Sequence, residues 1–98
     1  MGLEMTRAKT FANVWDALET SPEVAVAQTV RSEVIMAIGE RVRGWNTTQA
    51  RAARRLGITQ PRLNDLLQGK INKFSLDALL NLATRAGLKV SVAVRSAA

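Results

Sequence analysis

Residues 48–73 read TQARAARRLGITQPRLNDLLQGKINK, in which Gly57 separates two short stretches with apolar residues at helical spacing. Glycine enters the left-handed region of backbone conformation without steric cost, so Gly57 can end one helix and turn the chain sharply. The spacing predicts helices over residues 49–56 and 60–67. Two short helices joined by such a turn form a helix-turn-helix.

Both helices carry start signals and an apolar inner face. Thr48 and Thr59 occupy the N-cap positions, where a hydroxyl accepts a hydrogen bond from the first turn. Pro61 follows in the first turn of the second helix, where no backbone N–H is needed. The residues expected to face the core are Ala50, Ala53 and Leu56 in the first helix and Leu63, Leu66 and Leu67 in the second.

Three further helices are expected around this pair. A long one runs from Ser21 and Pro22, which have N-cap and first-turn chemistry, to about residue 43. Ser75 caps another, which ends before Gly87. One face of a short amphipathic helix near the start of the chain is formed by Phe11, Val14, Trp15 and Leu18. The chain is therefore predicted to form a mainly α, five-helix domain.

After Gly87 the period of the apolar residues changes from 3.6 to 2. The apolar members of this alternation are Leu88, Val90, Val92 and Val94. The pattern predicts one half-buried β-strand, which has no partner strand in its own chain and so leaves an open edge. The same strand of a second copy, paired about a two-fold axis, satisfies that edge in a homodimer. The alternatives are a strand that folds over its own helices and a loose tail.

The length of 98 residues allows one domain. We divide the chain into an N-terminal tail with its short helix (1–21), the helix-turn-helix domain (22–87) and the dimerisation strand (88–98).

The chain contains no cysteine and no histidine. Their absence removes disulfides, thiolate nucleophiles, the usual general base and the commonest metal ligand. We therefore expect a protein that is not an enzyme, with no catalytic residue, no metal and no cofactor. No apolar run approaches the length of a membrane span and no secretory leader is recognisable, so a cytoplasmic protein without membrane contact is expected.

The charge is distributed unevenly along the chain. Residues 1–40 carry three basic and six acidic side chains, a net charge of −3, whereas residues 41–98 carry eleven basic and two acidic ones, a net charge of +9. So dense a positive half attracts a polyanion, and double-stranded nucleic acid is the first candidate.

The outward face of the second short helix has the side chains that reach base edges, and cations surround it. A helix-turn-helix reads DNA in this way, with base contacts for specificity and phosphate contacts for register. The candidate base contacts are Gln60, Arg62, Asn64 and Asp65. The surrounding cations are Arg51, Arg54, Arg55, Lys70 and Lys73.

Residues 48–73 resemble the Cro/repressor-like (XRE) helix-turn-helix family. With FSLDALLNLATRAGLKVSVAVR (74–95) included, residues 33–95 are similar to short HigA-like antitoxins that accompany RelE-like (HigB-type) ribonuclease toxins. The resemblance implies a homodimer that binds an inverted-repeat operator, represses its own operon and neutralises a partner toxin. A stand-alone, phage-like repressor and a protein-interaction module that has lost specific DNA binding remain the alternatives.

The resemblance also implies roles for individual residues. Gln60 matches the first base-reading position, and Gln49 matches an amide that grips phosphate and braces the second helix. Asp65 departs from the commonest pattern; it either accepts a hydrogen bond from a cytosine amine or pairs with a nearby arginine. The full set of expected phosphate contacts is Thr48, Gln49, Arg51, Arg55, Thr59, Lys70 and Lys73.

Overall fold

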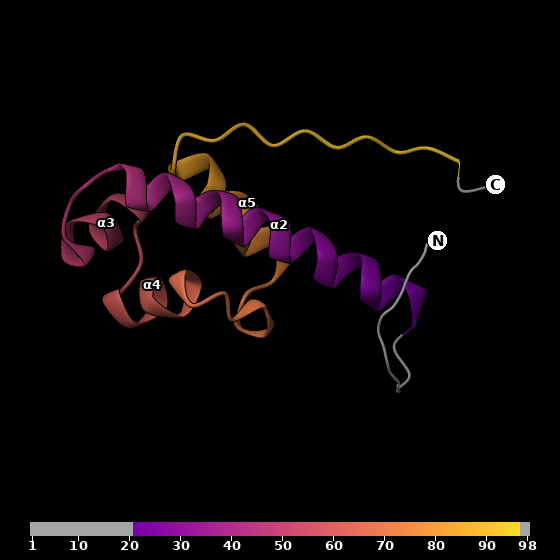
Figure 1. Ribbon diagram of the computed structural model, residues 1–98, viewed down its shortest axis with the longest axis horizontal. Helices are drawn as coiled ribbons and strands as arrows, with labels where there is room; N and C mark the ends of the chain where they lie inside the picture. The colour runs from indigo at the N-terminus through magenta and orange to yellow at the C-terminus, as the bar shows by residue number, and fades with distance from the viewer. Residues whose placement is uncertain (1–20, 97–98) are drawn as a thin grey trace.

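The computed structural model describes residues 21–96, which form four α-helices and one 3-10 helix (Figure 1). The helices are α2 (Pro22–Gly44), α3 (Gln49–Leu56), α4 (Gln60–Leu67), η1 (Ile71–Lys73) and α5 (Leu76–Arg85). The long helix α2 runs through the molecule, and the shorter helices pack against its C-terminal half. The predicted helix around Phe11 and Trp15 lies outside the described residues.

Local side-chain chemistry starts each α-helix where the sequence predicts it. The hydroxyls of Ser21, Thr48, Thr59 and Ser75 each accept a hydrogen bond from the backbone N–H three residues later, at 3.1–3.2 Å. Each hydroxyl therefore satisfies one of the N–H groups that the first turn leaves without an intrahelical partner. The predicted helix starts are confirmed.

The core lies where α3, α4 and α5 meet the second half of α2. Its largest fully buried side chains are Ile38, Leu56, Leu63, Leu66 and Leu79. The prediction that Ala50 faces the core is wrong, because the buried arc of α3 is centred on Leu56 and takes in Ala52 and Ala53 instead. Ala50 is exposed on the far side of the helix.

Arginines from other helices donate to the carbonyl groups at the C-terminal ends of α3, α4 and α5. Arg85 Nη1 donates to Leu56 O at 3.0 Å, and Arg43 Nη2 donates to Leu67 O at 3.3 Å. Arg41 donates to Ala86 O at 3.0 Å and to Gly87 O at 2.8 Å. A cation at a helix C-terminus satisfies free carbonyls and interacts favourably with the helix dipole.

Gly57 makes one of these approaches possible. Its φ of 73° is left-handed, and a Cβ built at this position would lie 2.6 Å from Arg85 Nη1. The backbone N–H groups of Gly57 and Ile58 close the end of α3: Gly57 N donates to Arg54 O, and Ile58 N donates to Ala53 O. The sharp corner between α3 and α4 thus depends on a residue without a side chain.

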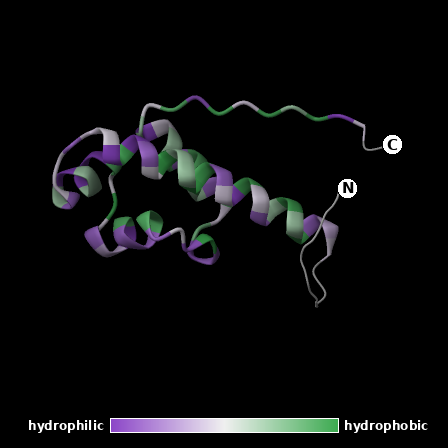
Figure 2. Ribbon diagram, viewed as in Figure 1, coloured by the Kyte–Doolittle hydropathy of each residue, from purple (hydrophilic) through white to green (hydrophobic). Residues whose placement is uncertain are grey.

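The prediction of a five-helix domain with a C-terminal β-strand paired across a homodimer is not upheld: residues 21–96 contain four α-helices and no strand. Leu88 N donates to Ala83 O at 2.9 Å, and the chain then runs extended beside α2 without a ladder partner (Figure 1). Hydrophobic and more polar residues alternate along this extension, as the ribbon colours of Figure 2 show, and such alternation is compatible with any extended backbone. A strand also requires backbone hydrogen bonds to a neighbouring strand, and residues 21–96 contain none.

We predict that Gly57→Ala lowers the free energy of unfolding by about 1–3 kcal/mol, because a Cβ is strained at this φ and displaces Arg85. Urea denaturation measures the loss. Gly44→Ala is the matched control, since it lies at the end of α2 with no atom within 4 Å of its added Cβ. Equal stability of the two variants would contradict this account of the corner.

Candidate nucleic-acid interface

Helix α4 presents a stripe of amide side chains on the side away from the core. Leu63 and Leu66 are buried, whereas Gln60, Asn64 and Gln68 are exposed and follow one another at intervals of four residues. Amide groups both donate and accept hydrogen bonds, which suits them to base edges in the major groove. Gln68 is the C-cap residue of α4 and was absent from our sequence-based set, although its spacing from Asn64 is a signal for it.

The N-termini of α3 and α4 carry three of the expected phosphate contacts. Gln49 is exposed as the first residue of α3. The Thr48 and Thr59 hydroxyl oxygens cap the two helices, which leaves each O–H able to donate outward. Helix N-termini favour anions because their first N–H groups are free and the helix dipole is positive there.

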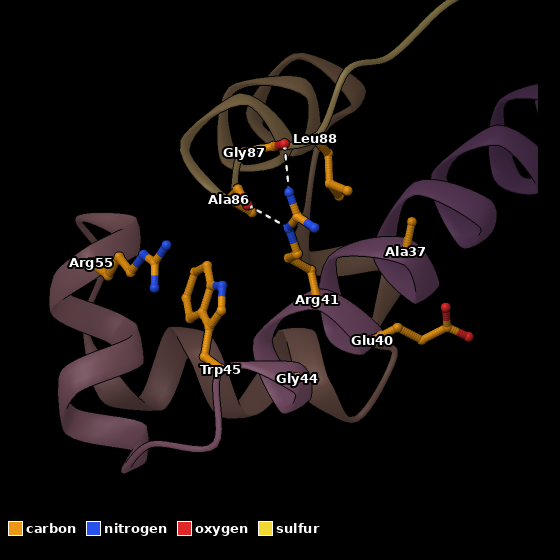
Figure 3. A pocket seen from close by; sticks show the side chains of 9 residues that line it. All are labelled: Ala37, Glu40, Arg41, Gly44, Trp45, Arg55, Ala86, Gly87 and Leu88. Atoms are coloured by element: carbon orange, nitrogen blue, oxygen red, sulfur yellow. Dashed lines mark hydrogen bonds between the residues drawn. The ribbon is translucent and has the colours of Figure 1, made fainter.

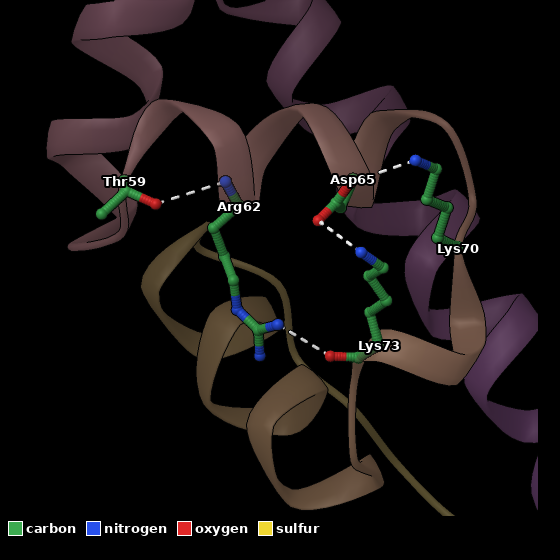
Figure 4. Close-up of polar contacts among 5 residues, drawn as sticks. All are labelled: Thr59, Arg62, Asp65, Lys70 and Lys73. Atoms are coloured by element: carbon green, nitrogen blue, oxygen red, sulfur yellow. Dashed lines mark hydrogen bonds and ion pairs between the residues drawn. The ribbon is translucent and has the colours of Figure 1, made fainter.

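Arg62 lies apart from the amide stripe. Its guanidinium donates to Lys73 O at 2.7 Å and lies over the ring of buried Phe74, 4.1 Å from the centroid (Figure 4). The side chain is half-buried and ties α4 to the loop that precedes α5. These contacts tie α4 to the segment between α4 and α5.

Asp65 is engaged by lysines. Its carboxylate pairs with Lys70 Nζ at 3.3 Å and with Lys73 Nζ at 3.8 Å (Figure 4). Of the two alternatives that the sequence left open, pairing within the chain is the one observed in the unbound protein, with lysines in place of an arginine. The structure therefore brings Asp65, Lys70 and Lys73 together at the C-terminal end of α4.

Helix α3 adds a cluster of arginines that form no ion pair within residues 21–96. Arg51, Arg54 and Arg55 are exposed and line one shallow depression by themselves. The guanidinium of Arg55 lies over the ring of Trp45, 3.9 Å from the centroid, at the edge of a cleft between α2 and the end of α5 (Figure 3). Stacking on the indole limits the directions in which Arg55 can point.

The basic side chains of residues 41–98 fall into those that contact the domain itself and those that are left free. Four of the eleven, Arg41, Arg43, Arg62 and Arg85, donate to backbone carbonyl groups inside the domain. Arg51, Arg54, Lys89 and Arg95 have no such partner among the described residues. Net charge alone therefore overstates how many side chains are free to bind a polyanion.

The residues expected to form the dimer contact lie along the C-terminal extension. Leu88 is half-buried against the core, and Val90 is partly covered. Val92 and Val94 are 80% and 89% exposed. The structure places all four on one continuous extended segment beside α2, where Val30 and Val34 line a groove together with Leu88, Val90 and Val92.

Comparison with known proteins gives the family. The family model described as a helix-turn-helix domain matches residues 18–95, well over half of the chain. The chain therefore belongs to this helix-turn-helix family, and the predicted motif is confirmed. A search of curated proteins finds no match. Among the helices formed by residues 21–96, none combines the length and the apolar character that crossing a membrane requires.

We predict that Arg62→Ala lowers the free energy of unfolding by about 1–2 kcal/mol, because it removes a charged hydrogen bond and a ring contact. Urea denaturation measures the change. Arg54 is exposed on α3, and its side chain has no partner within residues 21–96, so Arg54→Ala should stay within about 0.5 kcal/mol of the wild type. Equal free energies of unfolding for the two variants would show that the contacts of Arg62 do not stabilise the domain.

Proposed function

We propose that this protein is a sequence-specific DNA-binding transcriptional regulator. One observation carries the proposal: three exposed amides, Gln60, Asn64 and Gln68, follow one another along α4 and its C-cap. They stand in a motif whose two short helices both have N-termini capped by threonine hydroxyls and whose first helix carries exposed arginines. Amides on a short helix discriminate base edges, and the flanking cations bind phosphate of any sequence.

The mechanism follows from this division of labour. Helix α4 enters the major groove, where Gln60 and Asn64 hydrogen-bond to bases; Gln is suited to adenine N6 and N7. Gln49, Arg51 and the hydroxyls of Thr48 and Thr59 meet phosphates on the flank. Phosphate contacts supply most of the affinity and make it depend on salt, while base contacts supply the preference.

We further propose that the regulator acts as a homodimer on an inverted repeat. The exposed apolar side chains of the C-terminal extension, Val90, Val92 and Val94, support a contact with a second copy, because burying them removes apolar surface from water. A two-fold dimer presents two copies of α4 to successive major grooves, roughly 34 Å apart.

The finer role that we propose is that of an antitoxin, which represses its own operon in the cytoplasm and neutralises a ribonuclease toxin. It rests on the similarity of residues 33–95 to HigA-like antitoxins. The N-terminal end of α2, where Val24 and Val26 are exposed beside Glu23, offers an apolar and acidic surface away from α4 (Figure 1). Such a surface suits a cationic protein partner.

Gene neighbourhood separates the antitoxin from a stand-alone repressor. An adjacent gene for a small basic protein that arrests growth alone, and does not when this chain is co-expressed, supports the antitoxin. A locus without such a gene favours the stand-alone repressor.

We predict that Gln60→Ala weakens binding to the operator by about 1–3 kcal/mol and leaves binding to random DNA unchanged, because it removes a base contact. Titration of fluorescent duplexes measures both affinities. Arg51→Ala is the matched comparison: it should weaken both duplexes alike and reduce the salt slope by about one unit. Equal losses on both duplexes for Gln60→Ala would remove Gln60 from base reading.

We predict that the double variant Val92→Asp/Val94→Asp is a monomer, because two carboxylates oppose burial of the extension. Sedimentation velocity measures the oligomeric state. Val26→Asp introduces a charge at another exposed valine and should have the same oligomeric state as the wild type. A double variant that sediments like the wild type would place the dimer contact elsewhere.

A further inference from the structure

We propose that Asp65 is a specificity-determining residue that works by exchange of partners. In the free protein its carboxylate holds the ammonium groups of Lys70 and Lys73; on DNA the lysines move to phosphates, and the freed carboxylate requires a base amine. This inference rests on the proposed DNA-binding function and deepens it.

The geometry of the cluster supports an exchange. The backbone of the segment is fixed, since Lys70 N donates to Asp65 O at 3.1 Å and Lys73 N donates to Lys70 O at 3.0 Å. The ammonium groups are the mobile part: the lysine side chains are 46% and 57% exposed, whereas that of Asp65 is 21% exposed. The two lysines can therefore turn toward phosphate while the carboxylate stays on α4 (Figure 4).

Among residues 21–96, no cation other than Lys70 and Lys73 pairs with Asp65. The nearby guanidinium of Arg62 is held by Lys73 O and by the Phe74 ring. Once phosphates bind both lysines, the carboxylate is left unpaired in a partly desolvated groove, which is costly.

The major-groove edges of the bases differ in whether they offer a carboxylate a hydrogen-bond donor or only acceptors. Asp65 follows Asn64 on α4 and precedes Gln68 by three residues, so it shares the part of the helix that we place in the groove. Cytosine N4 and adenine N6 amines donate to it, whereas guanine O6 and N7 and thymine O4 are acceptors and repel it. Wrong sequences are thus rejected by an unpaired charge, which is specificity by repulsion.

The test is a titration of Asp65→Asn against two duplexes of equal length, the DNA upstream of the gene and a scrambled version. The variant should bind the scrambled duplex several-fold more tightly than the wild type does, because the lysines are released, and should bind the upstream duplex no more tightly. The ratio of the two affinities should fall roughly tenfold. Asp77→Asn, which removes the same charge from an exposed site on α5, should change both affinities alike.

A second measurement isolates the exchange. In a Lys70→Ala/Lys73→Ala background, Asp65→Asn should tighten binding to the scrambled duplex by a smaller factor than it does in the wild type, because only the repulsion by the carboxylate is then relieved and no lysine is released. Tightening by the same factor in both backgrounds, or an Asp65→Asn variant that shifts both duplexes by the same factor as Asp77→Asn does, would overturn the proposal. A wild-type protein with no preference between the duplexes would instead overturn the proposed regulator, while the lysine-dependent tightening would still report on the exchange.

Discussion

Of the four α-helices that residues 21–96 form, three end where an arginine from another helix meets their last carbonyl groups, and the arrangement of the domain depends on these contacts. Arg85 closes α3, Arg43 closes α4 and Arg41 closes α5. At Gly57 and Gly87 the left-handed backbone and the missing side chain leave room for the guanidinium. A small domain thereby gains crosslinks between its helices in addition to its few core side chains.

These contacts also determine which side chains remain free to bind a partner. Arginines that cap helix ends do not reach outward, and Arg62 is tied to the loop before α5. The surface that remains on the helix-turn-helix consists of the amides of α4, the arginine cluster of α3 and the Asp65–lysine cluster. The arginines inside the domain and the free groups on its surface therefore have separate roles, and Arg43 and Arg62 tie α4 to the rest of the domain.

Features encoded within a few residues could be predicted from the sequence. The hydroxyl caps at Thr48 and Thr59 and the turn at Gly57 depend on neighbours three or four positions away, so the helix-turn-helix was predictable. The rotation of α3, which exposes Ala50, depends on packing against other helices and was not. The sequence also did not settle the internal partners of Arg62 and Asp65. Arg62, for example, contacts Lys73 O and the Phe74 ring, which lie eleven and twelve residues further along the chain. The prediction of a strand over residues 88–98 was wrong for the described part, up to residue 96, because alternation does not supply a backbone partner.

The most direct measurement is a binding titration of the full chain at about 0.15 M salt, on the duplex upstream of its gene and on a scrambled duplex of equal length. A helix-turn-helix that reads bases through the α4 amides predicts a preference of roughly 10³ or more for the upstream duplex. Equal affinities that fade together as salt rises would contradict it, because phosphate contacts alone would then account for all binding.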